Sequence, residues 1–170
     1  MVKFYSFIFN HTSVHDPRFF IGRRAVFAFI YFCLLTNISF AGNTCGTATA
    51  ITVNGACDAT RVDGTAGTAI GSCTGTIARE EWWSFSVTSG QSYTVTYTTS
   101  TNDDPVIVIY NGACPGTFVA CQNATGTGNP ITETYTFTAA STGTYFVRML
   151  NYNSGNMDGS LCITSPPIKR

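Results

Sequence analysis

Histidine is scarce in this chain, and the scarcity removes whole classes of mechanism. Its two histidines, His11 and His15, both lie in the first 41 residues, which have the features of a removable leader. The rest of the chain therefore cannot assemble a Ser-His-Asp or Cys-His catalytic arrangement, or a histidine-ligated zinc or iron site. It also lacks a Gly-x-Ser-x-Gly motif and a Cys-x-x-Cys pair, which argues against a serine hydrolase, a zinc ribbon and a thiol redox centre.

A long hydrophobic run is missing as well. The apolar stretch at residues 25–35 has 11 residues, whereas a membrane-spanning helix needs about 20. It follows Arg23-Arg24 and precedes the small residues of Ser39-Phe40-Ala41, the order of regions in a secretory signal. We expect residues 1–41 to be a signal peptide with an extended leader, cleaved after Ala41. The protein is then secreted or displayed at the cell surface, with no membrane anchor after cleavage.

Positive charge is scarce in the part that would remain. Residues 42–170 number 129 and contain five basic and eight acidic residues, a net charge of −3. This length suits one compact domain, which we place at residues 42–164, with residues 165–170 as a linker stub or tail. The absence of a basic cluster argues against nucleic acid or an anionic membrane as a partner.

Cysteine, by contrast, is plentiful. Six cysteines follow the leader, an even number that favours disulfides in an exported protein; they are Cys45, Cys57, Cys73, Cys114, Cys121 and Cys162. Six cysteines allow 15 pairings. The short separation of Cys114 and Cys121 predicts a local loop. We then expect Cys57 to pair with Cys73, and Cys45 with Cys162, because the ends of a domain often lie close together.

Short segments rich in Thr, Val, Tyr and Phe alternate with Gly, Asn, Ser and Pro, which is typical of an all-β domain. Two of them, residues 82–87 and 93–98, alternate apolar and hydroxyl side chains and should each bury one face. Ser89-Gly90 between them predicts a tight hairpin turn. Residues 106–110 are apolar on both faces and predict a central strand.

Further strands are expected at residues 132–138, 144–151 and 159–164, with weaker ones at 48–53 and 65–70. About eight strands suffice for two packed sheets. The predicted fold is a two-sheet antiparallel β-sandwich, jelly-roll-like and stapled by disulfides.

Four segments together resemble the bacterial pre-peptidase C-terminal type of β-sandwich, in the cysteine-containing version common in secreted multidomain proteins of the Bacteroidetes. Cys45 precedes the first segment, 48–53. Residues 81–85, Glu-Trp-Trp-Ser-Phe, resemble the family's D-V-W-Y-S-F, and residues 104–112, Asp-Pro-Val-Ile-Val-Ile-Tyr-Asn-Gly, resemble D-T-V-L-x-L-Y-x-G. Residues 143–149, Gly-Thr-Tyr-Phe-Val-Arg-Met, resemble G-T-Y-Y-I-R-V. The resemblance spans roughly residues 43–164.

The resemblance implies an accessory module of the kind attached to secreted peptidases, adhesins and polysaccharide-degrading enzymes. Some such relatives bind calcium or an extracellular matrix polymer. This chain departs from the pattern after Cys121, where Gln122-Asn123-Ala124 replaces the two acids of the family's C-N-D-D.

Asn102, Asp103 and Asp104 precede the central strand and form a candidate Ca²⁺ site, with help from Asn123 or Asp158, because carboxylate and amide oxygens are calcium ligands. The alternative is a solvated turn leading into the strand, with no cofactor.

The adjacent Trp82 and Trp83 should face opposite sides of a strand. Parity with Phe85 assigns Trp83 to the core. Trp82 is then a candidate sugar-stacking platform, or else a residue packed beneath a loop.

A carboxylate-dependent hydrolase would need two acids at the correct separation; the available acids are Glu80, Glu81, Asp103, Asp104, Glu133 and Asp158. The alternative for these acids is solvation of turns and strand edges. We expect Arg148, flanked by Phe146 and Leu150, to form a partly buried ion pair with one of them.

These observations favour a secreted, non-catalytic accessory module that binds or stabilises, within a larger extracellular protein or as a remnant of one. The expected partner is an extracellular polysaccharide or a matrix protein. The alternatives are a carbohydrate-binding module or adhesin domain, and a small secreted hydrolase that uses two carboxylates.

Overall fold

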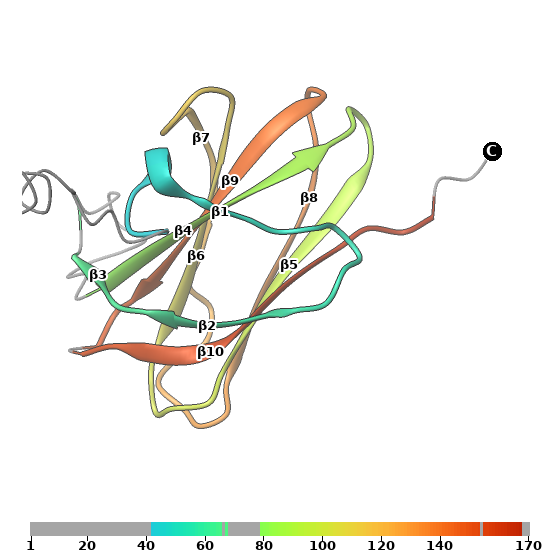
Figure 1. Cartoon of the computed structure of the whole chain (residues 1–170). Helices are drawn as coiled ribbons and strands as arrows, with labels where there is room; N and C mark the ends of the chain where they lie inside the picture. The colour runs from blue at the N-terminus through green and yellow to red at the C-terminus, as the bar shows by residue number, and fades with distance from the viewer. Residues whose placement is uncertain (1–41, 66, 68–78, 154, 168–170) are drawn as a thin grey trace, which may run out of the picture. The chain divides into compact units, whose positions relative to one another are not determined.

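The computed structural model describes residues 42–65, 67, 79–153 and 155–167, which lie in one compact unit, Ser39–Arg170. They form ten β-strands in two sheets and a short 3-10 helix, η2 (Cys45–Thr47) (Figure 1). The predicted signal peptide, residues 1–41, lies outside the described residues. Within the described ranges, no helix has the length and hydrophobicity needed to cross a membrane.

The two sheets differ in size. The six-stranded sheet has the order β1-β4-β9-β6-β7, with β3 also beside β4; its strands are β1 (Thr49–Ala50), β3 (Gly64–Thr65), β4 (Arg79–Val87), β6 (Pro105–Asn111), β7 (Thr117–Gln122) and β9 (Gly143–Asn151). The four-stranded sheet has the order β2-β10-β5-β8; its strands are β2 (Asp58–Val62), β5 (Ser92–Thr99), β8 (Thr132–Thr138) and β10 (Met157–Thr164). The predicted two-sheet sandwich is confirmed. Among the described strands, β1 and β4 pair in parallel and the other pairs are antiparallel.

Most of the predicted strands are present, and two observed strands were not predicted. The prediction for residues 132–138 coincides with β8, and those at 144–151 and 159–164 begin within two residues of β9 and β10. The prediction at 48–53 shortens to β1, and most of 65–70 lies outside the described residues. The missed strands, β2 and β7, are both sheet edges. Each buries a single residue fully, so neither has the strong alternation that identifies a strand in sequence.

The main core lies between the sheets, and it corrects the predicted hairpin. β4 pairs with β1, β3 and β9, whereas β5 pairs with β8 and β10, so the turn at Ser89-Gly90 connects the two sheets instead of two paired strands. Strands that face each other across a sandwich alternate in the same way as paired strands, because both bury one face. The two strands supply core residues from opposite sides: Trp83, Phe85 and Val87 from β4, and Tyr93, Val95 and Tyr97 from β5.

β6 is buried on both faces, as its sequence predicted. Ile107 and Ile109 contribute to the main core. Val106, Val108 and Tyr110 contribute to a second cluster on the other face of the six-stranded sheet; the remaining buried members are Cys45, Trp82 and Leu150. The segment around η2 therefore covers this outer face, and the strand has no solvent-exposed side.

The disulfide pairing differs from the prediction. Cys45 is bonded to Cys114, and Cys57 to Cys162, with Cα–Cα distances of 5.6 and 4.4 Å. Cys121 is also disulfide-bonded, and Cys73 lies outside the described residues. The predicted pairs 114–121, 57–73 and 45–162 are thus wrong.

The physical reason for the difference is tertiary. Strand register places Asp58 opposite Leu161, so the next antiparallel pair is Cys57 with Cys162. The packing of η2 on the outer face brings Cys45 to Cys114. Neither the register of β2 and β10 nor the packing of η2 can be predicted from the spacing of the cysteines in the sequence.

The segment after β10 is attached to the domain. Asn54 exchanges two hydrogen bonds with the Ser165 backbone, at 2.8 and 3.0 Å. Gln91 donates to Ser165 Oγ at 2.7 Å and to the Pro166 carbonyl at 2.6 Å. The part of the predicted tail that the structure describes therefore lies along the surface of the sandwich.

Candidate functional site

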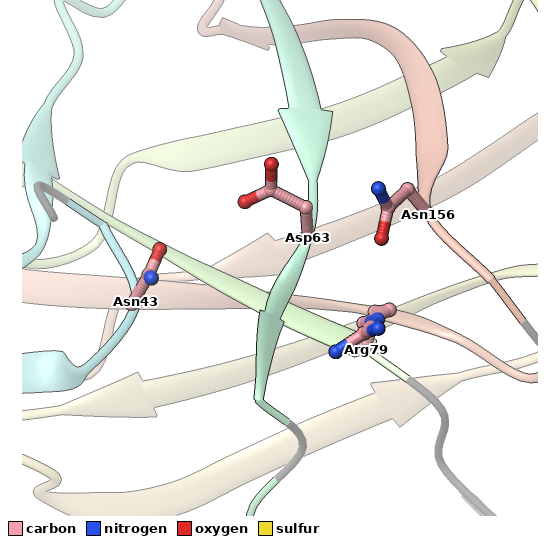
Figure 2. Close-up of a pocket in the computed structure, with 4 residues that line it drawn as sticks. All are labelled: Asn43, Asp63, Arg79 and Asn156. Carbon is pink, nitrogen blue, oxygen red and sulfur yellow. The ribbon is translucent and has the colours of Figure 1, made fainter. Parts of the chain in front are cut away.

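A polar pocket opens at one end of the sandwich, where β2 and β10 approach β4. Its volume is about 290 Å³, and it is lined by Asn43, Asp63, Arg79 and Asn156 (Figure 2). Four separate segments supply these side chains: the stretch before η2, the residue after β2, the first residue of β4 and the residue before β10. One carboxylate, one guanidinium and two amides offer both donors and acceptors.

Glu81 lies beside this pocket and has an unusual environment. It is two residues after Arg79 in β4, so both project from the same face of the strand. Glu81 is 6% exposed, and its Oε2 has no hydrogen-bond partner in the part of the chain that the structure describes. Burial, followed by the negative charges of Asp63 and Glu80, raises the pKa of Glu81 to about 7. A buried carboxyl with a shifted pKa beside a polar pocket is a typical mark of a functional site.

A second polar network occupies the opposite face of β4. Glu80 accepts hydrogen bonds from Arg148 Nε at 3.0 Å, from the Gly67 backbone at 2.7 Å and from Trp82 Nε1 at 3.0 Å. Arg148 and Glu80 also form an ion pair through Nη2 and Oε2. The predicted ion pair of Arg148 with an acid is therefore present, and it is almost fully buried.

Trp82 belongs to this network and is not an exposed platform. It is 6% exposed and stacks on Tyr110 with ring centroids 5.4 Å apart. The Arg148 guanidinium lies 5.4 Å from the Trp82 ring centre. The accessible ring face that sugar stacking required is absent, whereas Trp83 is in the core as parity predicted.

The structure separates the residues of the candidate calcium site. Asn102 is exposed, whereas Asp103 is buried. Asp103 accepts hydrogen bonds from the Thr101 hydroxyl and from the Asn151 amide, the latter at 2.8 Å, so both of its oxygens have internal partners. Asp158 pairs with Arg61 at 2.9 Å.

Asp104 is the member of that loop with free coordination capacity. In the part of the chain that the structure describes, its Oδ1 is buried with no hydrogen-bond partner, and burial followed by the charge of Glu133 raises its pKa. Among the described residues, however, no three His, Cys, Asp or Glu side chains cluster as a metal site would. Calcium takes six to eight oxygen ligands, and the calcium site at this loop stays a prediction.

The other buried acids maintain loops and strands. Glu133 is 1% exposed, and its Oε2 accepts from the backbones of Ala124 and Thr125 at 3.0 and 2.9 Å and from the Thr125 hydroxyl at 2.7 Å. Glu80 and Asp103 are similarly occupied by internal donors. These three acids are thus engaged in structural hydrogen bonds.

The sequence did not single out the four pocket residues. They come from strand ends and connections, and only the pairing of β2 with β10 and the approach of β4 bring them together. Glu81 was among the candidate acids. The sequence gives no sign that it is buried with Oε2 lacking a partner among the described residues, except that two tryptophans follow it in the chain.

Comparison with known proteins gives a family match over part of the chain. Residues 79–149, from β4 to β9, match the family model of the bacterial pre-peptidase C-terminal domain. The match agrees with the resemblance found in the sequence and supports a non-catalytic accessory module. No curated protein matches the chain.

Two solved structures have a similar chain path. One is the pre-peptidase C-terminal domain of collagenase from Bacillus anthracis, with 17% identity, a TM-score of 0.42, and coverage of 68% of this chain and 93% of that one. The other is PliG from Aeromonas hydrophila, a periplasmic inhibitor of g-type lysozyme, with 12% identity, a TM-score of 0.44, and coverage of 70% and 97%.

Proposed function

We propose that this protein is a secreted or cell-surface accessory module without catalytic activity. It would bind a ligand for a larger extracellular protein, or stabilise that protein. The observation that carries the proposal is the match of residues 79–149 to the pre-peptidase C-terminal family. The disulfides Cys45–Cys114 and Cys57–Cys162 agree with an oxidising compartment. The cysteine-containing type of the Bacteroidetes is the subgroup that the sequence resembles.

The polar pocket is the surface that we assign to binding. Its two amides, carboxylate and guanidinium suit a neutral, hydroxyl-rich ligand, because each hydroxyl both donates and accepts hydrogen bonds. A volume of about 290 Å³ is at the small end of the range for small-molecule sites. An extracellular polysaccharide that inserts one end or one branch is the partner class that fits best.

The experiment is a glycan-array screen of the exported protein and of two variants. Arg79→Ala removes the guanidinium of the pocket and should abolish binding. Arg61→Ala removes an exposed guanidinium on the edge strand β2 that pairs with Asp158 and does not line the pocket, and it should leave binding unchanged. Binding that both variants retain would exclude the pocket, and an array without any signal would leave a stabilising module as the function.

The rival function, a carboxylate-dependent hydrolase, is favoured by one observation, the raised pKa of Glu81. A general acid near neutral pH needs such a group, but the mechanism needs a second carboxylate. Asp63 is the nearby candidate. Turnover of a glycoside or peptide substrate that Glu81→Gln and Asp63→Asn each abolish would replace the accessory-module proposal.

A further inference from the structure

Gly42 is fixed against Glu81. Its nitrogen donates to the Thr47 carbonyl at 2.7 Å, and its carbonyl accepts from the Trp82 nitrogen at 2.6 Å, so both of its backbone polar groups are engaged. Its φ of +89° favours glycine. A Cβ at this position would overlap Glu81 Oε1 and lie 3.2 Å from Glu81 Cγ. The Gly42 backbone therefore lies directly on the carboxylate.

Glu81 has no counter-ion among the described residues in this arrangement. The charges that act on it, from Asp63 and Glu80, are both negative and raise its pKa. The nearby Arg148 is paired with Glu80, and Arg79 lines the pocket. A buried carboxylate without a cation or a donor carries a large desolvation cost. The charged carboxylate is compensated only if a positive group or a donor reaches it.

We propose that cleavage after Ala41 supplies this group, the α-ammonium of Gly42, as the counter-ion of Glu81. The proposal rests on the export included in the proposed function and on the cleavage after Ala41 that the sequence predicts. Hydrolysis of the 41–42 peptide bond consumes one water and leaves a carboxylate on Ala41 and an amine on Gly42, which is protonated at neutral pH.

The geometry favours this pairing after cleavage. The nitrogen and the Cβ position of Gly42 are bonded to the same Cα, so the ammonium lies within ion-pair reach of Glu81. As a peptide nitrogen it has one hydrogen, which the Thr47 carbonyl already accepts. As an ammonium it has two more, and these are available to the carboxylate. Processing thus converts a destabilising acid into one half of a buried ion pair.

The two forms should differ in their dependence on pH. Before cleavage, the folded-state pKa of Glu81 is about 7 against an ordinary value of 4.5. A raised carboxyl pKa contributes stability below the ordinary value, and this contribution is lost as the pH rises from 4.5 to about 7. After cleavage, the ammonium stabilises the charged carboxylate, so the loss in this window should disappear. The other charged groups that act on Glu81 are Asp63 and Glu80, and Arg79 projects from the same face of β4.

The test uses the full chain with a specific protease sequence in place of residues 36–41, so that cutting leaves Gly42 as the first residue. Thermal unfolding is measured at pH 7 before and after the cut. A charge-assisted hydrogen bond of this kind should raise the melting temperature by roughly 4–8 °C. A matched control places the cut two residues earlier, which leaves an extension and should give no rise.

Two further measurements decide the role of Glu81. In Glu81→Gln the cut should no longer raise the melting temperature. An equal rise in this variant, or no rise in the parent protein, would overturn the proposal. If the variant does not fold, an NMR titration of the ¹⁵N-labelled Gly42 amine replaces it: pairing should raise the amine pKa above the usual ~7.7–8.0, and an ordinary value would refute the pairing. Because an added protease makes the cut, these results do not depend on whether the protein is exported. Amino-terminal sequencing of the secreted protein tests export and natural cleavage separately.

Discussion

Removing either partner of the Glu80–Arg148 pair should destabilise the domain severely. The two side chains are 6% and 4% exposed, so Glu80→Ala removes the carboxylate that pairs with the buried Arg148 cation. Loss of one partner of a buried pair costs about 3–5 kcal/mol, a large part of the roughly 5–15 kcal/mol that stabilises a typical domain. Glu80 also accepts from Gly67 and Trp82, and these donors lose their partner too, which places the expected cost at the upper end.

The reasoning is tested by a double-mutant cycle in urea or guanidinium. Arg148→Met should cost about 3 kcal/mol, and the variant with Glu80→Met added should recover at least 1–2 kcal/mol relative to the sum of the single changes, because no unpaired charge remains. Tryptophan fluorescence reports the transition directly, since Trp82 lies within the network. Single changes that cost under about 1 kcal/mol, or strictly additive effects, would refute the assignment.

The Arg61–Asp158 pair is the matched control. Its side chains are 55% and 38% exposed, and exposed pairs contribute little to stability because solvent screens their charges. Arg61→Ala should therefore leave the unfolding midpoint almost unchanged. A cost comparable to that of Glu80→Ala would mean that burial does not explain the difference between the two pairs.

Three further outcomes are expected. Non-reducing peptide mapping should recover a peptide joining Cys57 to Cys162, and removing this bridge should cost about 4–5 kcal/mol by chain entropy; any other partner for Cys57 would contradict the β2–β10 register. Asp104→Asn should raise the melting temperature at pH 7 but not at pH 3, because the raised pKa of Asp104 removes stability as the pH rises. A calcium-dependent rise that this variant abolishes would support the metal site instead. Trp82→Ala should cost about 3–5 kcal/mol without changing glycan binding by the folded protein, and a selective loss of binding would restore its ligand role.

Local pattern was sufficient to predict the strands that are buried. The apolar run at 106–110 indicated a strand covered on both faces, and parity separated Trp83 from Trp82. The exposed position suggested for Trp82 failed because the sequence contains no sign that Tyr110 and η2 cover that face. The edges β2 and β7 were missed because they bury little.

The same reasoning could not predict which segments that are distant in the sequence lie side by side in the fold. The alternation on either side of Ser89-Gly90 fits a hairpin and a crossover between sheets equally well. The pocket and the Gly42–Glu81 contact join segments that are distant in sequence, and only tertiary packing reveals them. The cysteine pairs follow strand register, which the spacing of the cysteines does not encode.

The Cys57–Cys162 bridge gives the domain a defined response to mechanical load. It joins the first and last strands of the four-stranded sheet and has a sequence separation of 105. A force applied between the two ends of the domain passes through this covalent bond, and the sheets inside the loop bear little of it. About 350 Å of extended chain, at 3.3–3.6 Å per residue, is thereby withheld from stretching. In an extracellular protein under tension, the chain between Cys57 and Cys162 would lengthen only after this bond is reduced.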